Sequence, residues 1–189
     1  MSRAAVFMDR DGVINEDRAY VHRVEDFAWI DGVRQALGIM RSKGYLLVLV
    51  TNQAGIAYGY YTVEDYLTLT GWMQRELARE DLAFDGVYFC PHHPAKGHPP
   101  YLTSCRCRKP GTGMLEAARD ELDISLADSY MVGDRMTDVE TGRNAGCRMS
   151  FLVTTGKPLP DFKGRTPDFV RRDLLAVATE LPAAGLQHA

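Results

Sequence analysis

Two short segments of this sequence each carry a pair of aspartates. DRDG contains Asp9 and Asp11, and GDRMTD contains Asp134 and Asp138. Several carboxylates in one crevice repel one another unless a hard divalent cation offsets their charge, and Mg²⁺ is held by oxygen ligands. If the fold brings the two segments together, they predict a magnesium site.

The same aspartates could carry out phosphoryl transfer, which needs a nucleophile, a cation beside the phosphoryl oxygens and a group that protonates the leaving oxygen. Asp9 is the candidate nucleophile and would form an aspartyl-phosphate, while Asp11 would protonate the leaving alcohol and then activate water. Thr51 and Lys109 would hold the phosphoryl group. Any one strand-end aspartate alone could equally be a helix cap or a turn former. Four of them at these positions favour the catalytic interpretation.

A Cys and His pair and a second Cys pair flank one loop rich in Gly and Pro. The four residues are Cys90, His92, Cys105 and Cys107. Thiolate and imidazole ligands in a closed tetrahedral set are typical of structural Zn²⁺, so we predict a zinc loop at 90–109. His93 or His98 could take the place of His92, and a site with two metals or an unligated loop are further alternatives.

The predicted zinc loop also places two cations. Arg108 and Lys109 directly follow the second Cys pair, so a fixed loop would direct both toward a phosphorylated ligand near Asp9. Cys147 lies far from this cluster along the chain. We predict that it is a buried small residue rather than a nucleophile or a ligand.

Composition narrows the class of protein. The chain has 189 residues, of which 46% are hydrophobic and 25% charged, and its net charge is −3. These values are ordinary for a globular domain and argue against a general nucleic-acid binder. No apolar run is long enough to span a bilayer or to act as a signal peptide, and cysteines beside histidines indicate a reducing compartment. We therefore predict a cytoplasmic monomer whose partner is a small molecule rather than nucleic acid or a membrane.

Apolar runs and helical periodicity predict the elements that position these residues. The predicted strands lie at 4–9, 45–50, 86–90, 129–134 and 149–153, and the predicted helices lie near 33–40, from Thr62, at 112–122, at 136–145 and after Arg172. This alternation predicts an α/β fold, with a doubly wound, Rossmann-like parallel sheet in a single domain at 1–189. Ligands of such sheets bind beyond the carboxyl ends of the strands, where Asp9, Thr51 and Asp134 fall. The aromatic residues predicted to serve packing are Trp29, Trp72, Tyr58, Tyr60 and Tyr61.

The motifs resemble those of the haloacid dehalogenase superfamily. The resemblance is carried by DRDGV at 9–13, Thr51 with Asn52, Lys109, and GDRMTD. It implies that Asp9 is the phosphorylated nucleophile and Asp11 the acid/base. It also implies that Mg²⁺ is held by Asp9, the backbone carbonyl of Asp11 and Asp134, with Asp138 reaching the ion through water. Val13 departs from the family, in which many members have Thr. Because the loops after Asp11 and Thr51 are short, we expect a capless or minimally capped site.

A narrower resemblance points to one branch of that superfamily. CPHHP, CRCRKP, DRAYVH at 17–22 and TNQAGIA at 51–57 are similar to the D-glycero-D-manno-heptose 1,7-bisphosphate phosphatase family. The similarity implies removal of the C7 phosphate, on the way to ADP- or GDP-heptose for lipopolysaccharide or surface glycans. The residues that it implies for substrate binding are Asp17, Tyr20, Asn52, Gln53, Ala54, Arg108 and Arg135, with the two arginines on the distal phosphate.

Two alternatives stay open at this point. The histidinol-phosphate phosphatase branch shares the zinc loop and the GDR-x-TD pattern, although an amine-bearing substrate would prefer acidic neighbours to Arg108 and Arg135. The chain could also be an inactive, zinc-stabilised module that holds a phosphorylated partner through Arg108 and Lys109.

Overall fold

A six-stranded parallel sheet forms the centre of the protein. The computed structural model describes residues 2–155, 162 and 166–185. Within them the strand order is β3-β2-β1-β4-β5-β6, and each neighbouring pair is parallel. The strands are β1 (Ala5–Met8), β2 (Leu46–Asn52), β3 (Gly86–Cys90), β4 (Tyr130–Gly133), β5 (Met149–Val153) and β6 (Phe169–Arg171). The predicted doubly wound α/β fold is confirmed.

The winding of the sheet reverses between β1 and β4. The chain runs outward from β1 to β2 and β3 on one side, and from β4 to β5 and β6 on the other. Loops that leave two adjacent strands at such a reversal diverge and open a crevice beyond the carboxyl ends of the strands. Asp9 directly follows β1 and Asp134 directly follows β4, so both aspartates enter this crevice.

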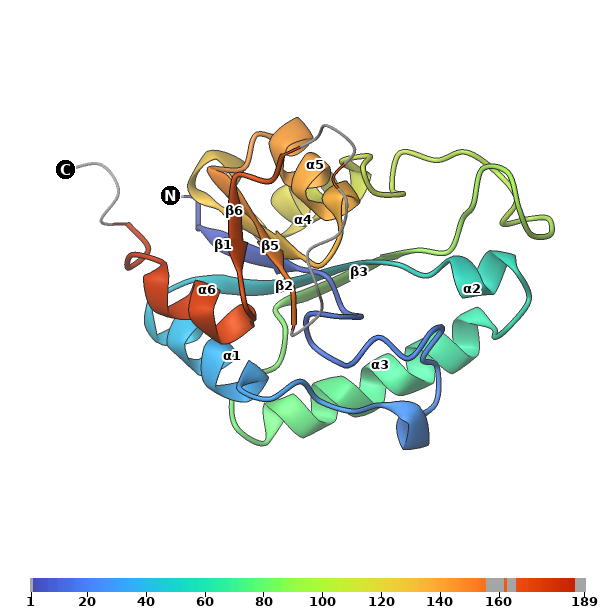
Figure 1. Ribbon diagram of the computed structural model, residues 1–189, viewed down its shortest axis with the longest axis horizontal. Coiled ribbons are helices and arrows are strands. Elements are labelled where there is room, and N and C mark those ends of the chain that lie inside the picture. The colour runs from blue at the N-terminus through green and yellow to red at the C-terminus, as the bar shows by residue number, and fades with distance from the viewer. Residues whose placement is uncertain (1, 156–161, 163–165, 186–189) are drawn as a thin grey trace.

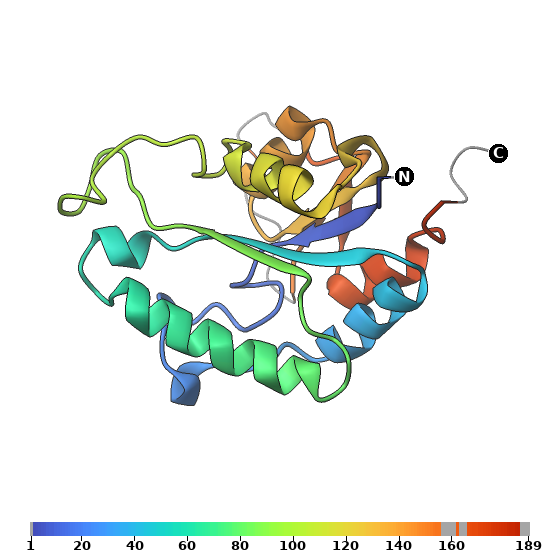
Figure 2. The same cartoon turned by 180° about the vertical axis from the view of Figure 1, so that it is seen from behind.

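Helices cover both faces of the sheet, as Figures 1 and 2 show. One face carries α1 (Val33–Ser42), α3 (Val63–Ala78) and α6 (Leu174–Glu180), and the other carries α4 (Gly113–Leu122) and α5 (Met136–Ala145). Because side chains alternate along a strand, Val6 and Met8 pack in the core under α1, α3 and α6, whereas Ala5 and Phe7 pack in the core under α4. Burial on both faces explains why the strands are continuously apolar.

Two predicted helix boundaries have a clear local cause. Thr62 caps α3, because its hydroxyl accepts from the Asp65 N–H at 3.1 Å and the Asp65 carboxylate accepts from the Thr62 N–H at 2.8 Å. Such a capping box contributes about 1 kcal/mol to helix stability. Gly44, with φ of 88°, follows the end of α1 in the left-handed conformation that glycine adopts without strain.

The structure differs from the predicted elements at three places. β2 continues through Thr51 and Asn52, because these residues still pair with Phe89 and Cys90 of β3. Helix α2 (Ala54–Ala57) and the edge strand β6 were not predicted. A four-residue helix and a three-residue strand are too short to show a periodic pattern.

The connections at the carboxyl ends of β1 and β2 are short. The segment between β1 and α1 contains a single 3-10 turn, η1 (Val24–Asp26), and that between β2 and α3 contains α2; both segments lie wholly within the described residues. Neither can form a separate cap domain. A second 3-10 turn, η2 (Leu126–Asp128), precedes β4. None of the described helices is long and apolar enough to cross a membrane.

Candidate active site and metal-binding loop

Three aspartates converge in the crevice between β1 and β4. One carboxylate oxygen from each of Asp9, Asp134 and Asp138 lies within 4.8 Å of the other two. Asp138 belongs to the first turn of α5, where its carboxylate accepts from the Arg135 N–H at 3.0 Å and so caps the helix. The structure therefore brings the two predicted aspartate segments together. Oxygen ligands at this spacing fit a hard cation such as Mg²⁺.

Glycines allow the carboxylates to pack this closely. A Cβ on Gly12, whose φ is 82°, would lie 2.3 Å from Oδ2 of Asp134. A Cβ on Gly133 would lie 2.1 Å from the Cβ of Asp138. Any side chain at either position would displace an aspartate.

Lys109 provides a buried cation beside two of these aspartates. Its Nζ lies 3.0 Å from Oδ1 of Asp9 and 2.6 Å from Oδ1 of Asp138, and it donates to the carbonyl oxygen of Val50 at 3.0 Å. Burial lowers the pKa of Lys109, but the two carboxylates outweigh that effect, so its pKa is raised. The ammonium therefore stays charged, and its predicted role in holding a phosphoryl oxygen stays a prediction.

The candidate nucleophile is buried and partly neutralised. Asp9 is 8% exposed, and Oδ1 accepts from the Arg10 N–H at 2.7 Å. Burial raises the pKa of Asp9 to about 6, with Asp138 and Asp11 adding to the rise and Lys109 opposing it. Asp9 is thus mainly ionised at neutral pH, as a nucleophilic carboxylate must be.

Asp11 lies in a cradle of hydrogen-bond donors. The Arg10 guanidinium donates to both carboxylate oxygens at 2.9 Å, Asn15 donates to Oδ1 at 3.0 Å, and Gln53 donates to Oδ2 at 3.2 Å. Arg10 itself is 1% exposed and also donates to the carbonyl oxygen of Val21 at 2.6 Å. Sequence reasoning missed Arg10 and Asn15, because nothing in the local pattern shows that an arginine at a strand exit is buried.

Asn52 holds the backbone of Lys109. Its side-chain oxygen accepts from the Lys109 N–H at 3.0 Å, and its NH₂ group donates to the Lys109 carbonyl at 3.3 Å. Thr51 is 1% exposed, and its hydroxyl accepts from Gln53 at 2.9 Å. The Asn52 side chain thus bonds to the segment that leaves the predicted zinc loop, and its predicted role in substrate binding stays a prediction.

A cavity of about 530 Å³ opens above the aspartates. Its lining includes, of the predicted catalytic and substrate-binding residues, Asp9, Asp11, Asp17, Tyr20, Asn52, Gln53, Ala54, Arg108, Lys109 and Arg135. Thr51 contacts Gln53 just beneath this lining. Tyr58 and Tyr61 also line the cavity, and Tyr61 packs with Ile56 and Tyr66 in a buried apolar cluster as well. The tyrosine-rich sequence gave no sign of which rings face the site.

Two arginines approach the cavity from different elements. The Arg108 guanidinium donates to the backbone carbonyl of His92 at 3.0 Å. The Arg135 guanidinium donates to Asp17 at 3.2 Å and lies 3.8 Å from Asp134. Two guanidinium groups on one cavity suit an anionic group of the ligand, such as a second phosphate.

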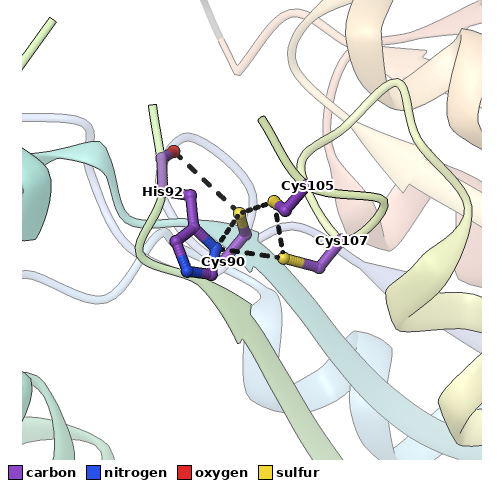
Figure 3. Close-up of side chains that lie close together, drawn as sticks. All are labelled: Cys90, His92, Cys105 and Cys107. Carbon is purple, nitrogen blue, oxygen red and sulfur yellow. Dashed lines mark hydrogen bonds between the residues drawn. The ribbon is translucent and has the colours of Figure 1, made fainter. Parts of the chain in front are cut away.

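The four predicted zinc ligands meet in one cluster, which Figure 3 shows. The Sγ atoms of Cys90 and Cys105 are 3.3 Å apart and those of Cys105 and Cys107 are 2.9 Å apart. Nδ1 of His92 lies 3.5 Å from the Sγ of Cys107 and 3.8 Å from that of Cys90. Three sulfurs and one imidazole nitrogen gathered this closely form the donor set that is typical of structural Zn²⁺ sites.

The other histidines and the remaining cysteine have different surroundings. Nδ1 of His93 accepts from the Lys96 N–H at 2.9 Å, and the backbone of His98 bonds to that of Ala57 at 2.8 Å. Cys147 packs against the core under α4, where burial raises its pKa to about 12. A thiol with that pKa is a poor nucleophile at neutral pH.

Known proteins resemble this chain along most of its length. A family model described as HAD-hydrolase-like matches residues 106–177. The D-glycero-beta-D-manno-heptose-1,7-bisphosphate 7-phosphatase of Vibrio cholerae is 48% identical over 161 residues, which cover 85% of this chain and 87% of that protein. The protein of the same name from Escherichia coli is 44% identical, with 95% of this chain and 92% of that protein covered.

Solved structures agree with the sequence relatives. The D,D-heptose 1,7-bisphosphate phosphatase of B. bronchiseptica, complexed with magnesium and phosphate, superposes with a TM-score of 0.75 at 31% identity, covering 93% of this chain and 96% of that one. The enzyme of the same name from Burkholderia thailandensis has a TM-score of 0.66 at 27% identity, with 93% and 96% covered.

Proposed function

This chain belongs to the family of D-glycero-beta-D-manno-heptose-1,7-bisphosphate 7-phosphatases, and we propose that it removes the C7 phosphate of D-glycero-D-manno-heptose 1,7-bisphosphate through an aspartyl-phosphate. The observation that carries the proposal is the convergence of Asp9, Asp134 and Asp138 within 4.8 Å, beneath a cavity that two arginines line. The names of the relatives specify the beta anomer, and we propose the same anomer for this chain. The product would enter ADP- or GDP-heptose synthesis for surface glycans.

In the first half of the reaction, a carboxylate oxygen of Asp9 attacks phosphorus and the bond from phosphorus to the C7 oxygen breaks. Asp11 gives its proton to that oxygen, so the sugar leaves as an alcohol. Lys109 and Thr51 hold the phosphoryl oxygens, and the backbone contacts of Lys109 with Asn52 keep its ammonium beside Asp9. Positioning and charge stabilisation supply most of the rate enhancement in this type of reaction.

In the second half, water attacks the phosphorus of the aspartyl-phosphate while Asp11 removes its proton. The bond between phosphorus and the Asp9 oxygen breaks, which restores the Asp9 carboxylate and the protonated Asp11 and releases inorganic phosphate. One residue thus serves as acid and then as base. The inactive binding module is disfavoured, because every group that these two steps need lies in one site.

We propose that Asp9, Asp134 and the backbone carbonyl of Asp11 would hold Mg²⁺. Asp138 would contact the ion through water, because its carboxylate is engaged by Lys109 and by the Arg135 N–H. When bound, Mg²⁺ supplies charge neutralisation at the phosphoryl oxygens. Burial of three carboxylates beside one lysine leaves an excess of negative charge that such an ion offsets.

We propose that the cluster of Cys90, His92, Cys105 and Cys107 holds structural Zn²⁺. The ion would fix a segment that has little core of its own. The carbonyl of His92 orients Arg108, so the same residue would bind zinc through its ring and direct a substrate-binding arginine through its backbone. Because zinc thiolates need a reducing compartment, we also propose that the protein is cytoplasmic.

The preferred substrate follows from the charge of the cavity. Arg108 and Arg135, which line the cavity together with Asp17 and Tyr20, suit the second phosphate of a sugar bisphosphate. Histidinol phosphate carries an amine where the bisphosphate carries this anion. The arginines and the named relatives both favour the sugar bisphosphate.

One set of assays tests the proposal. Phosphate release is measured on both anomers of the heptose bisphosphate and on histidinol phosphate, with and without Mg²⁺. We expect fastest release from the beta anomer, no release without Mg²⁺, and a loss of about 10⁴-fold or more in Asp9→Asn with the fold intact by circular dichroism. Faster hydrolysis of histidinol phosphate would overturn the substrate assignment, and release that survives in Asp9→Asn would overturn the mechanism.

A further inference from the structure

We infer that Tyr61 is a positioning residue for catalysis, because its hydroxyl fixes the Gln53 side-chain amide that in turn holds Asp11 and Thr51. The inference rests on the roles proposed above for Asp11 and Thr51. Tyr61 itself does not touch the reacting atoms in this scheme.

The chain of contacts is buried and continuous. The Tyr61 hydroxyl donates to Oε1 of Gln53 at 2.5 Å. Nε2 of Gln53 donates to Oδ2 of Asp11 at 3.2 Å and to Oγ1 of Thr51 at 2.9 Å. Tyr61 is 6% exposed and Gln53 is 2% exposed. Water competes poorly for such bonds, so each partner depends on the next.

The hydroxyl of Tyr61 determines which way the amide faces. An amide has one acceptor end and one donor end. Burial raises the pKa of Tyr61 above its ordinary value, so the hydroxyl remains a donor and requires the oxygen of Gln53. The NH₂ group must then face Asp11 and Thr51. In that orientation it binds a lone pair of the Thr51 oxygen, and the hydroxyl hydrogen of Thr51 is left for a phosphoryl oxygen.

A reversed amide would weaken both catalytic groups. Its oxygen would face the Asp11 carboxylate, and two acceptors repel each other at hydrogen-bond distance. The Thr51 hydroxyl would turn its hydrogen toward that oxygen and away from the substrate. Without the Tyr61 hydroxyl, only repulsion from the Asp11 carboxylate would select the productive orientation, and that repulsion disappears when Asp11 carries the proton that it must give to the leaving group.

The surroundings of Tyr61 hold its ring in one place. The ring stacks on His22 with centroids 4.9 Å apart and an angle of 6° between planes. A Cβ on Gly55 would lie 2.2 Å from the Tyr61 ring, so the ring occupies space that only a glycine at that position leaves. The hydroxyl is therefore delivered to Gln53 by a fixed ring.

The first test is Tyr61→Phe, which removes one oxygen and keeps the stacked ring. We expect kcat on the sugar bisphosphate to fall roughly 5- to 10-fold, the effect of one buried hydrogen bond, while KM changes less than about 2-fold. Tyr60→Phe is the matched control, because it removes the same hydroxyl from a tyrosine that is 59% exposed and lies outside the chain of contacts. A rise in KM with kcat unchanged, or an equal loss in Tyr60→Phe, would overturn the inference.

A double-mutant cycle tests whether Tyr61 acts through Gln53. Gln53→Ala alone should lose at least as much kcat as Tyr61→Phe, and adding Tyr61→Phe to it should cause no further loss. If Tyr61→Phe causes the same fold-loss with or without Gln53, the ring or its hydroxyl acts by another route and the inference fails. Thermal unfolding of each variant shows that the measured proteins are folded.

A comparison of two leaving groups separates positioning of Asp11 from a merely structural role of Tyr61. 4-Nitrophenyl phosphate needs no proton on its leaving oxygen, whereas a sugar alcohol does. In Tyr61→Phe we expect kcat/KM to fall at least about 3-fold more on the sugar bisphosphate than on 4-nitrophenyl phosphate; equal losses would contradict positioning of Asp11.

Asp11→Asn separates this inference from the proposed function. If Asp11→Asn releases phosphate at the wild-type rate, the acid/base role proposed for Asp11 is wrong whatever Tyr61 does. If Asp11→Asn is impaired and Tyr61→Phe is not, the proposed function stands and the inference falls.

Discussion

The two ends of the cavity are built from different kinds of structure. At the inner end, Asp9 directly follows β1 and Asp138 lies in α5, and their carboxylates share the buried ammonium of Lys109. The outer end, as we call the solvent-exposed part of the lining, includes Tyr20, which is 46% exposed, and the Arg135 side chain, which is 65% exposed. A packed sheet fixes positions closely, whereas loops tolerate change. From this contrast we expect the strand ends to determine the rate of phosphoryl transfer and the loops to determine which substrate binds.

Lys109 joins the two ends. Its ammonium belongs to the inner end, while its backbone lies two residues after Cys107 of the Cys and His cluster and is held by Asn52 of β2. Because β2 as well as the zinc loop fixes this residue, damage to the loop should disturb the outer end more than the inner one.

The largest expected effect, and the strongest test of this contrast, comes from removing a predicted zinc ligand. In Cys105→Ser we expect zinc content to fall well below one equivalent and kcat/KM on the bisphosphate to fall about 100-fold, mostly through KM. Cys147→Ser, a cysteine outside the cluster, serves as the control and should keep its zinc. Metal analysis and steady-state kinetics measure both quantities. A loss confined to kcat would show that the loop fixes Lys109 rather than the outer end.

A smaller effect should separate the two phosphates of the substrate. In the double variant Arg108→Ala/Arg135→Ala, kcat/KM on the bisphosphate should fall roughly 30-fold, as expected for lost charge-assisted hydrogen bonds, whereas kcat/KM on heptose 7-phosphate should change less than about 3-fold. Arg106→Ala is the control, because that arginine pairs with Glu116 at 2.5 Å. Equal losses on both substrates would show that the arginines act at the reacting phosphate rather than at the second phosphate.

The smallest effect concerns stability at the inner end. The pKa of Asp9 is about 6 in the folded chain, against an ordinary value of 3.8. Between these values the folded chain binds a proton that the unfolded chain has lost, so the free energy of unfolding falls as pH rises through that interval. In magnesium-free buffer at pH 7.5, Asp9→Asn should therefore be more stable than the wild type by roughly 1–2 kcal/mol, less than the full shift because Lys109 also loses a partner.

Urea unfolding at several pH values measures this difference. The advantage of Asp9→Asn should shrink as pH falls from 7.5 toward 5, because the folded wild type becomes protonated there. An advantage that grows on acidification would show that burial does not strain the Asp9 carboxylate.

The sequence was informative where function depends on position along the chain. Asp9 and Asp134 follow apolar strands, and adjacent parallel strands deliver such residues to one edge, so their meeting could be predicted. The cluster of Cys90, His92, Cys105 and Cys107 could be predicted because two closely spaced pairs of ligands flank one loop. These inferences need only the order of elements.

The sequence was silent where function depends on which partner a side chain selects. Arg10 is buried because Asp11 and the Val21 carbonyl accept from it, and Asn52 faces Lys109 across 57 positions of sequence. Tyr61 could not be told from Tyr60 by its neighbours. Packing decides these contacts, and no periodic pattern records them.

The glycine at position 12 has a consequence for how this protein can diverge. Even one added carbon there would meet the Asp134 carboxylate, so the β1 exit admits almost no variation while the reaction is retained. The outer loops hold side chains that can be exchanged without moving the strand ends. Lineages descended from this chain should therefore acquire new substrates before they acquire a new chemistry, with the turn at Gly12 as the part that drifts least.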